Sequence, residues 1–325
     1  MNRFIIFILL GFTSAAALKI NHTRQGSETR VFVVVLGHGD ETRSQGLSAT
    51  LQSFYEQLGP SNFDCLIFVW NPNMKLPEVP PGCEIKVTPG VFMEYTELIP
   101  EDRLQASRYA YLMADEITLD VPLSKHHGPM NIEKLRDLAA ENCVDVITPA
   151  QYALEPGDIS YPFLKPSNSG VAGRFMHFVD FQGALLTPTI VHLLARLASP
   201  HITGCWGYDS LLYSAVEKWT GRAPRIGIAD QLVVNMGLHN LSSLRADQDV
   251  NDHPCGNVTN LNGYIVHDAA RDQVDYWHGK SGLQDNQGLQ VLPSEYLQVP
   301  HPGATKALAE CSDLLAPGSL AEKIG

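Results

Sequence analysis

Two adjacent acidic residues, Asp115 and Glu116, directly follow an apolar stretch at 109–113. This stretch has the composition of a buried β-strand, and open α/β sheets bind their ligands at the carboxyl ends of such strands. Neighbouring carboxylates repel each other unless a cation lies between them. Mg²⁺ and Mn²⁺ prefer oxygen ligands and commonly hold phosphates as well. The pattern predicts a divalent metal site at Asp115 and Glu116, with a solvated strand end or a helix cap as the simpler alternative.

Five further candidates follow in order along the chain: Asp180, Trp206, Gly207, Asp209 and Asp230. Asp209 stands at the expected N-terminus of a helix, where the helix dipole favours an ionised carboxylate. An N-cap role is one interpretation of this position, and Trp206 suits a place in the core. Asp180 and Asp230 are expected at strand ends.

The order of these residues resembles a large family of unknown function, best represented in plants. That family is similar to the GT-A class of nucleotide-sugar glycosyltransferases. Its motifs are D-E-D-L at the end of an aromatic strand, then F-V-E, G-W-G-L-D and G-V-V-D leading to I-V-H. The resemblance covers 31–238. Asp180 matches the acid of F-V-E, Asp230 matches the acid of G-V-V-D, and the W-G-x-D positions are matched by Trp206, Gly207 and Asp209.

The chain also departs from the family pattern. Ala114 stands at the first acid of D-E-D-L, while Asp115 and Glu116 stand at its Glu and its final Asp. Cys205 replaces the first glycine of G-W-G-L-D, and Asn235 stands where the family has His. The loss of one acid and one imidazole weakens the expected metal site.

The resemblance implies a GT-A-like (Rossmann-type), mostly parallel sheet flanked by helices. It implies a metal-dependent glycosyltransferase that uses Mn²⁺ or Mg²⁺ and moves a sugar from a nucleotide-sugar donor to a glycan or small-molecule acceptor. In such an enzyme the metal would stabilise the departing nucleoside diphosphate. The resemblance implies that Asp209 acts as general base toward the acceptor hydroxyl, so it is the candidate catalytic residue, with an N-cap role as the alternative. It also allows Trp206 to stack on a sugar ring, with a place in the core as the alternative. The residues expected to bind donor or acceptor are His38, Asp180, Trp206, Gly207, Asp230 and Asn235.

Two other functions stay open. The departures at Ala114 and Asn235 favour a catalytically inactive, secreted GT-A-like protein that binds carbohydrate or a partner. His38 and Asp40, which follow the first apolar stretch, also resemble the A-H-P-D-D-E motif of zinc-dependent N-acetylglucosaminyl deacetylases. Here the proline and one Asp are missing, and the chain offers only adjacent His126 and His127 in place of a later H-x-x-H.

The elements that would position these residues alternate along the first 240 residues. Apolar and β-branched runs predict strands at 31–36, 65–70, 84–88, 109–113, 144–148, 175–179, 184–187 and 225–234. Helical spacing predicts helices at 47–58, 131–139, 188–197 and 209–219, with a helical turn at 100–107. This alternation is typical of an α/β sheet and predicts one domain over 29–240. Turn residues dominate 241–325, which we expect to be a loop-rich extension packed on that domain, with one helix at 305–315.

The N-terminus predicts the location of the protein. Arg3, an apolar run at 4–12 and small residues up to Ala17 have the layout of a secretory signal peptide over 1–17. The run is too short to span a bilayer, and no later stretch is long and apolar enough. We therefore expect secretion or residence in the lumen of the ER or Golgi, with an uncleaved signal anchor as the alternative. The N-x-S/T motif marks three possible glycosylation sites, Asn21, Asn240 and Asn257.

Charge and cysteine content agree with this location. The chain has 325 residues and a formal net charge of −12, which disfavours nucleic acid as a partner. An oxidising compartment would allow its six cysteines to pair in several ways. We expect one or two structural disulfides, with Cys255 and Cys311 as one plausible pair. No C-x-x-C motif suggests a zinc knuckle or a redox site.

Overall fold

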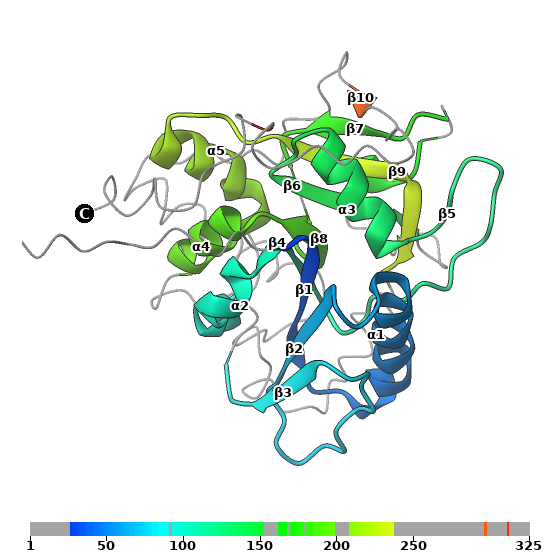
Figure 1. Cartoon of the computed structure of the whole chain (residues 1–325), viewed down its shortest axis with the longest axis vertical. Coiled ribbons are helices and arrows are strands. Elements are labelled where there is room, and N and C mark those ends of the chain that lie inside the picture. Colours follow the sequence, from blue (N-terminus) through cyan, green and yellow to red (C-terminus); the bar gives the residue numbers. More distant parts are fainter. Residues whose placement is uncertain are drawn as a thin grey trace, which may run out of the picture.

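The computed structural model describes residues 27–90, 93–152, 162–167, 170–178, 180–198, 208–236, 296–297 and 311. The strands of this part of the chain are β1 (Ser27–His38), β2 (Phe63–Val69), β3 (Cys83–Val87), β4 (Ser107–Met113), β5 (Gly128–Pro129), β6 (Val146–Tyr152), β7 (Gly173–Met176), β8 (Gly183–Leu186), β9 (Ile226–Asn235) and β10 (Tyr296–Leu297). They form one sheet in the order β10-β7-β9-β6-β8-β4-β1-β2-β3, with β5 paired to β9 (Figure 1).

The sheet has two groups of parallel strands joined by the antiparallel strand β8, and β7 lies antiparallel to β9 beyond the second group. β3, β2, β1 and β4 are parallel to one another, and so are β6, β9 and β5. β8 lies between β4 and β6 and is antiparallel to both, so these two strands point the same way. The carboxyl ends of β1, β4, β6 and β9 therefore lie at the same edge of the sheet. The predicted α/β class, a mostly parallel sheet flanked by helices, is confirmed.

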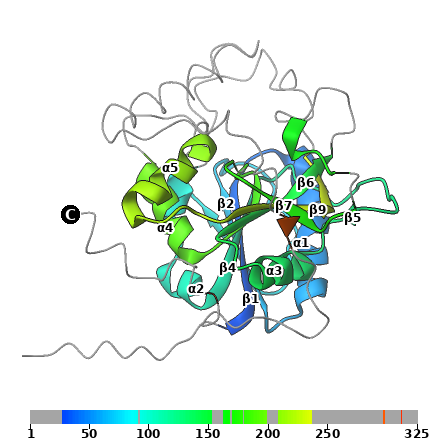
Figure 2. The same cartoon turned by 90° about the horizontal axis from the view of Figure 1, so that it is seen from above.

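Helices cover both faces of the sheet. The α-helices of the described part are α1 (Ser44–Leu58), α2 (Glu101–Gln105), α3 (Ile132–Glu141), α4 (Pro188–Leu197) and α5 (Tyr208–Thr220), and the 3-10 turns are η1 (Glu41–Arg43), η2 (Glu94–Leu98) and η3 (Pro162–Leu164). α1 and α3 pack on one face, and α2, α4 and α5 pack on the other (Figure 2).

The sequence of β1 explains why the sheet is buried on both faces. Val31, Val33 and Val35 pack in the core under α1 and α3, while Phe32 and Val34 pack in the core under α2, α4 and α5. A continuous β-branched and apolar run is typical of a central parallel strand covered on both sides. β1 thus fixes where the residues that follow it emerge.

Local signals placed most helix ends correctly. Gly59, with a φ of 73°, ends α1, and Pro188 is the first residue of α4. The side chain of Asn131 accepts a hydrogen bond from the backbone N–H of Lys134 at 2.8 Å and so caps α3. The strand predicted at 225–234 is β9. The predicted helix at 305–315 lies outside the described residues.

Two short strands were not predicted. β5 pairs with β9, and β10 pairs antiparallel with β7. Each has only two residues, which is too short to show any hydrophobic periodicity. β10 comes from the predicted extension at 241–325, so this segment adds a strand to the main sheet.

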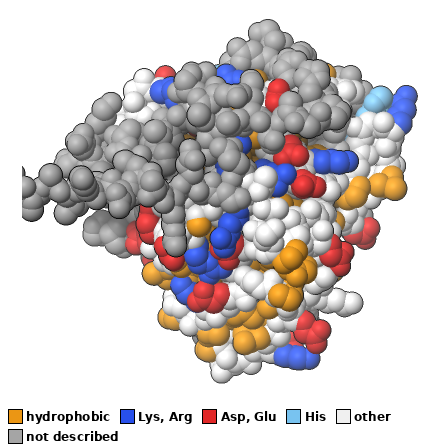
Figure 3. Space-filling model, in the orientation of Figure 1, with side chains coloured by type: hydrophobic (Ala, Val, Ile, Leu, Met, Phe, Trp, Pro, Cys, Tyr) orange, Lys and Arg blue, Asp and Glu red, His pale blue; other side chains and the backbone are white. Residues whose placement is uncertain are grey.

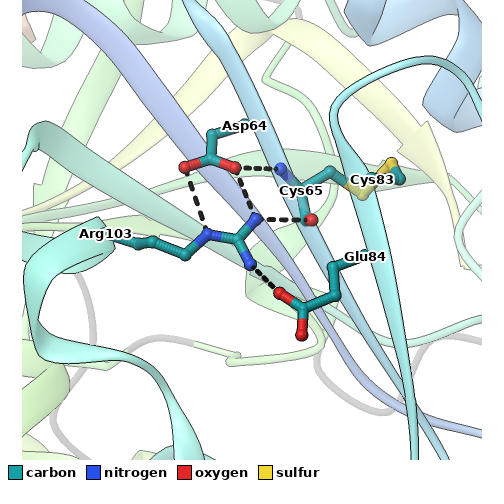
Figure 4. The surroundings of a disulfide bond; sticks show 5 residues. All are labelled: Asp64, Cys65, Cys83, Glu84 and Arg103. Atoms are coloured by element: carbon teal, nitrogen blue, oxygen red, sulfur yellow. Dashed lines mark hydrogen bonds and ion pairs between the residues drawn. A yellow bond between two sulfur atoms is a disulfide. The ribbon is translucent and has the colours of Figure 1, made fainter.

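Two disulfides are present in the described part of the chain. Cys65 and Cys83 pair between the neighbouring strands β2 and β3. Arg103 lies beside this bond and bridges Asp64 and Glu84 (Figure 4). Cys311 is bonded to Cys143, with their Cα atoms 5.3 Å apart. The predicted pairing of Cys311 with Cys255 is therefore wrong, since a cysteine sulfur forms one disulfide only; Cys255 itself lies outside the described residues.

The described surface mixes charges of both signs. Acidic and basic side chains lie next to one another on the face in view (Figure 3). Large hydrophobic side chains are exposed at Leu76, Val87, Leu98 and Leu123. Among the helices described, none has the length and the apolar character needed to cross a lipid bilayer.

Candidate functional site

Five charged or titratable residues gather at the carboxyl edge of the sheet: His38, Arg43, Asp115, Glu116 and Asp180. We call them the strand-end cluster. His38 is the last residue of β1, and the acid pair follows β4, the parallel neighbour of β1. The turn from β1 into α1 supplies Arg43, and the segment between β7 and β8 supplies Asp180.

Asp115 is held from two sides. Nδ1 of His38 lies 2.7 Å from Asp115 Oδ2, and Arg43 Nη1 donates to Asp115 Oδ1 at 2.9 Å. An ionised carboxylate only accepts hydrogen bonds, so His38 donates through Nδ1. Nε2 of the same ring lies 3.0 Å from Oγ of Ser44, within hydrogen-bond distance. The strand predicted over 31–36 extends to His38, whose side chain is fully buried.

Ser44, His38 and Asp115 have the hydrogen-bond order of a Ser-His-Asp triad. A triad base must reach both the nucleophile and the leaving group of a substrate. The His38 side chain has 0% exposed surface, so it contacts only the protein. We interpret the three residues as a network that fixes Asp115 against the first turn of α1.

Arg43 lies between the two acids. Its Nη1 is 2.9 Å from Asp115 Oδ1 and 3.2 Å from Glu116 Oε2, and its Nε is 3.7 Å from Asp40 Oδ2. Partial burial by itself lowers the pKa of Arg43, but Asp115 and Glu116 outweigh this effect and raise it. Asp40 also caps η1, because its Oδ1 accepts the backbone N–H of Thr42 at 2.8 Å. The guanidinium thus supplies the positive charge that two adjacent carboxylates need.

Glu116 and Asp180 are acids with perturbed protonation. Burial raises the pKa of Glu116 to about 7; Arg43 opposes this shift, while Asp115 and Asp180 add to it. Burial also raises the pKa of Asp180, although hydrogen bonds from Gln151 Nε2 at 2.7 Å and from a backbone N–H at 3.0 Å act against it. A carboxyl group with a pKa near neutrality is suited to general acid–base work.

The predicted metal site does not fit this arrangement as it stands. Each oxygen of Asp115 is within hydrogen-bond distance of His38 or Arg43, and Arg43 also holds Oε2 of Glu116. Within the described ranges, no group of three or more His, Cys, Asp or Glu side chains is arranged to hold a metal ion. A divalent ion that bridged Asp115 Oδ1 and Glu116 Oε2 would have to displace the guanidinium.

Asp230 lies apart from the position predicted for it. It was expected at a strand end, but it lies inside β9, where the irregular pairing with β6 begins. Its Oδ1 accepts the backbone N–H of Ser167 at 2.8 Å and lies 3.3 Å from Arg174 Nη1. Burial raises the pKa of Asp230, while Ser167 and Arg174 lower it. Among the described residues, its buried Oδ2 has no hydrogen-bond partner.

Asn235 lies close to the acid pair in space. It is the last residue of β9, and its backbone forms a bridge with Thr118 through hydrogen bonds of 3.0 and 2.9 Å. Thr118 follows Glu116 by two residues, so the end of β9 lies beside the segment that carries the acids. Asn235, Asp115 and Glu116 therefore lie at one edge of the sheet.

The region of the predicted base is described only in part. Asp209 lies in the first turn of α5, as predicted, and its Oδ1 accepts the backbone N–H of Ser210 at 2.9 Å. Trp206 and Gly207 lie outside the described residues. A catalytic role for Asp209 therefore rests on the sequence motif.

Three residues of the site were not predicted: Arg43, Ser44 and Gln151. Arg43 follows Asp40 by three residues, a spacing that would have indicated an ion pair over one helical turn. Gln151 lies near the end of β6. That it lies at the same edge of the sheet as the other strand ends can be recognised only once the strand order is known. Nothing local in the sequence links Ser44 to His38.

Comparisons with known proteins find solved structures that are similar to this chain at low sequence identity. No family model matches the chain, and no curated protein matches it. A crystal structure of S. aureus TarS 1-349 in complex with UDP is similar with a TM-score of 0.39 and 10% identity, over 63% of this chain and 60% of that chain. A197 from STIV is similar with a TM-score of 0.32 and 9% identity, over 63% of this chain and 84% of that chain. This chain thus covers less than two thirds of the TarS structure.

Proposed function

We propose that the protein is a glycosyltransferase that moves a sugar from a nucleotide-sugar donor to a glycan or small-molecule acceptor. The observation that carries the proposal is the position of Asp115 and Glu116 at the carboxyl edge of β4, beside the ends of β1 and β9. Ligands of open α/β sheets bind at this edge. The family resemblance of the motifs supports the same reaction.

Sugar transfer needs a base for the acceptor. The acceptor oxygen bonds to the anomeric carbon, the bond from that carbon to the diphosphate oxygen breaks, and the hydroxyl proton passes to a carboxylate. Asp209 stays the predicted base. Glu116 is the second candidate, because its pKa of about 7 suits proton transfer near neutral pH.

The requirement for Mn²⁺ or Mg²⁺ stays an untested prediction. The proposed reaction includes no metal ion, because the guanidinium of Arg43 lies between the two acids.

We propose the secretory pathway as the place of action. The predicted signal peptide at 1–17 supports it, and two disulfides are typical of an oxidising compartment. Expression in cultured animal cells tests both this address and Asn21, Asn240 and Asn257. A mobility shift on glycosidase treatment that is lost in the three Asn→Gln variants supports the proposal; an unglycosylated protein retained in the cytosol contradicts it.

An inactive binding protein is the second candidate. The internal pairing of Asp115 with His38 and Arg43 favours it, together with Ala114 and Asn235 at the family's acid and His positions. The deacetylase alternative has less support. Both ring nitrogens of His38 lie within hydrogen-bond distance of other side chains, and the side chain of Asp40 accepts the backbone N–H of Thr42 as the cap of η1.

Calorimetric titration with UDP and GDP, with Mn²⁺ or with EDTA, tests the proposal. A glycosyltransferase should bind one of the two nucleotides saturably, and Asp115→Asn should weaken that binding because the carboxylate of Asp115 holds His38 and Arg43 in place. Asp102→Asn, at an exposed acid of α2, is the matched control and should leave it unchanged. Binding of glycans without nucleotide would favour the inactive protein, and zinc binding without nucleotide would favour the deacetylase.

A further inference from the structure

The acid pair already has a cation of its own. Arg43 Nη1 lies within 3.2 Å of one oxygen from each acid, namely Asp115 Oδ1 and Glu116 Oε2. Divalent ions bind carboxylate oxygens at about 2.0–2.6 Å, so an ion that bridged these two oxygens would need the position that Nη1 holds. The guanidinium and the ion would therefore compete for one position.

Other members of the cluster are held within the protein. Asp115 Oδ2 lies 2.7 Å from Nδ1 of the fully buried His38 ring. Asp180 is nine-tenths buried and bonded to Gln151 and to a backbone N–H. Arg43 itself keeps 35% of its side chain exposed. A substitution there would change the charge at the site without opening the core.

We infer that Arg43 is the resident cation of Asp115 and Glu116, so that the native protein takes no divalent ion at these acids and binds its nucleotide without one. The part of the inference that concerns the nucleotide rests on the proposed function. The part that concerns the acids does not. Removing the guanidinium charge would leave two adjacent carboxylates uncompensated, and these would then attract a divalent ion.

The experiment titrates Mn²⁺ alone into the full-length secreted protein and into the variant Arg43→Gln. Arg30→Gln is the matched control, because Arg30 forms a 2.7 Å ion pair with Asp64 and has a similarly exposed side chain, 33% against 35%. The native protein and the control should show no saturable binding. Arg43→Gln should bind Mn²⁺ roughly 10- to 1000-fold more tightly than the native protein, the range over which one neighbouring opposite charge changes the proton affinity of a carboxylate. Adding Asp115→Asn to it should abolish the gain.

Two results would overturn the inference. One is saturable Mn²⁺ binding by the native protein that Asp115→Asn removes. The other is a folded Arg43→Gln variant, verified by circular dichroism, that binds Mn²⁺ no better than the native protein. If Arg43→Gln does not fold, Mn²⁺ titration of the native protein still tests the inference through the first result. Arg43→Lys keeps the charge and should behave like the native protein.

A parallel titration separates the inference from the proposed function. UDP or GDP is titrated into the native protein in EDTA and then in Mn²⁺. Equal affinity in both supports the inference, and affinity that appears only with Mn²⁺ overturns it. Absence of binding in both conditions rejects the proposed function, while the result with Mn²⁺ alone still decides whether Arg43 is the resident cation.

Discussion

At the scale of the single residue, Glu116 shows how surroundings set chemistry. Its carboxyl group is mostly buried beside two other acids, and one guanidinium only partly compensates for them. Its folded-state pKa is therefore raised from 4.5 to about 7. Between these two pH values the folded protein holds a proton that the unfolded chain releases. The free energy of unfolding therefore falls as pH rises through this window, because the native state binds more protons.

Glu116→Gln should remove this pH dependence. Relative to the variant, the native protein should lose stability between pH 4.5 and about 7, with a slope of up to about 1.4 kcal/mol per pH unit. Urea denaturation of both proteins across this range measures the difference. Glu97→Gln, at an exposed acid of η2, should give a flat difference. A flat difference for Glu116→Gln as well would mean that Glu116 titrates normally.

At the scale of the element, the turn from β1 into α1 positions Arg43 and Ser44. The indole ring of Trp70, the residue after β2, packs directly on Gly39 in this turn. A Cβ atom at Gly39 would lie 1.8 Å from Trp70 Cε2. The backbone N–H of Trp70 also donates to the carbonyl of His38 at 3.1 Å. The turn therefore depends on the absence of a side chain at Gly39.

Gly39→Ala should displace Trp70 and destabilise the fold by about 1–3 kcal/mol, as other overpacked sites do. Urea denaturation measures the loss, and tryptophan fluorescence reports the movement of the ring. Gly59→Ala is the control, since a Cβ atom there meets nothing within 4 Å and the cost is confined to the backbone at a φ of 73°. An unchanged fluorescence spectrum in Gly39→Ala would show that the turn adapts without moving Trp70.

The start of α3 offers a second test at this scale. Asn131 caps the helix, and the next backbone N–H, that of Ile132, donates to Gln57 of α1 at 2.7 Å. Asn131→Ala should reduce the free energy of unfolding by about 1 kcal/mol through loss of the cap. Asn131→Asp keeps an acceptor and should retain most of the stability. Equal midpoints of urea denaturation in all three proteins would contradict a capping role.

At the scale of the whole molecule, the disulfides tie distant parts of the chain together. Cys143 and Cys311 are separated by 168 residues, whereas Cys65 and Cys83 are separated by 18. Cross-linking restricts the unfolded chain more when the closed loop is longer. The first bond also attaches Cys311 to the turn that follows α3.

Removing the disulfide that closes the longer loop should lower the free energy of unfolding more. The double variant Cys143→Ala/Cys311→Ala should lose about 5 kcal/mol, against about 3 kcal/mol for Cys65→Ala/Cys83→Ala. Thermal denaturation of the two variants, both in non-reducing buffer, compares them. A larger loss in the second variant would show that burial of Cys65 in the core outweighs loop length.

The sequence alone determined the order and class of most elements, because their signals are local. Buried β-branched runs, the cap at Asn131 and the glycine at the end of α1 each depend on neighbours a few residues away. It also placed the acids at the end of β4. Only the tertiary structure brought His38 and Arg43 to Asp115, across 77 and 72 residues. Only the tertiary structure placed the antiparallel β8 between the parallel strands β4 and β6 and joined Cys143 to Cys311. These choices depend on strand order and long-range packing, and hydrophobic periodicity along the chain does not encode either.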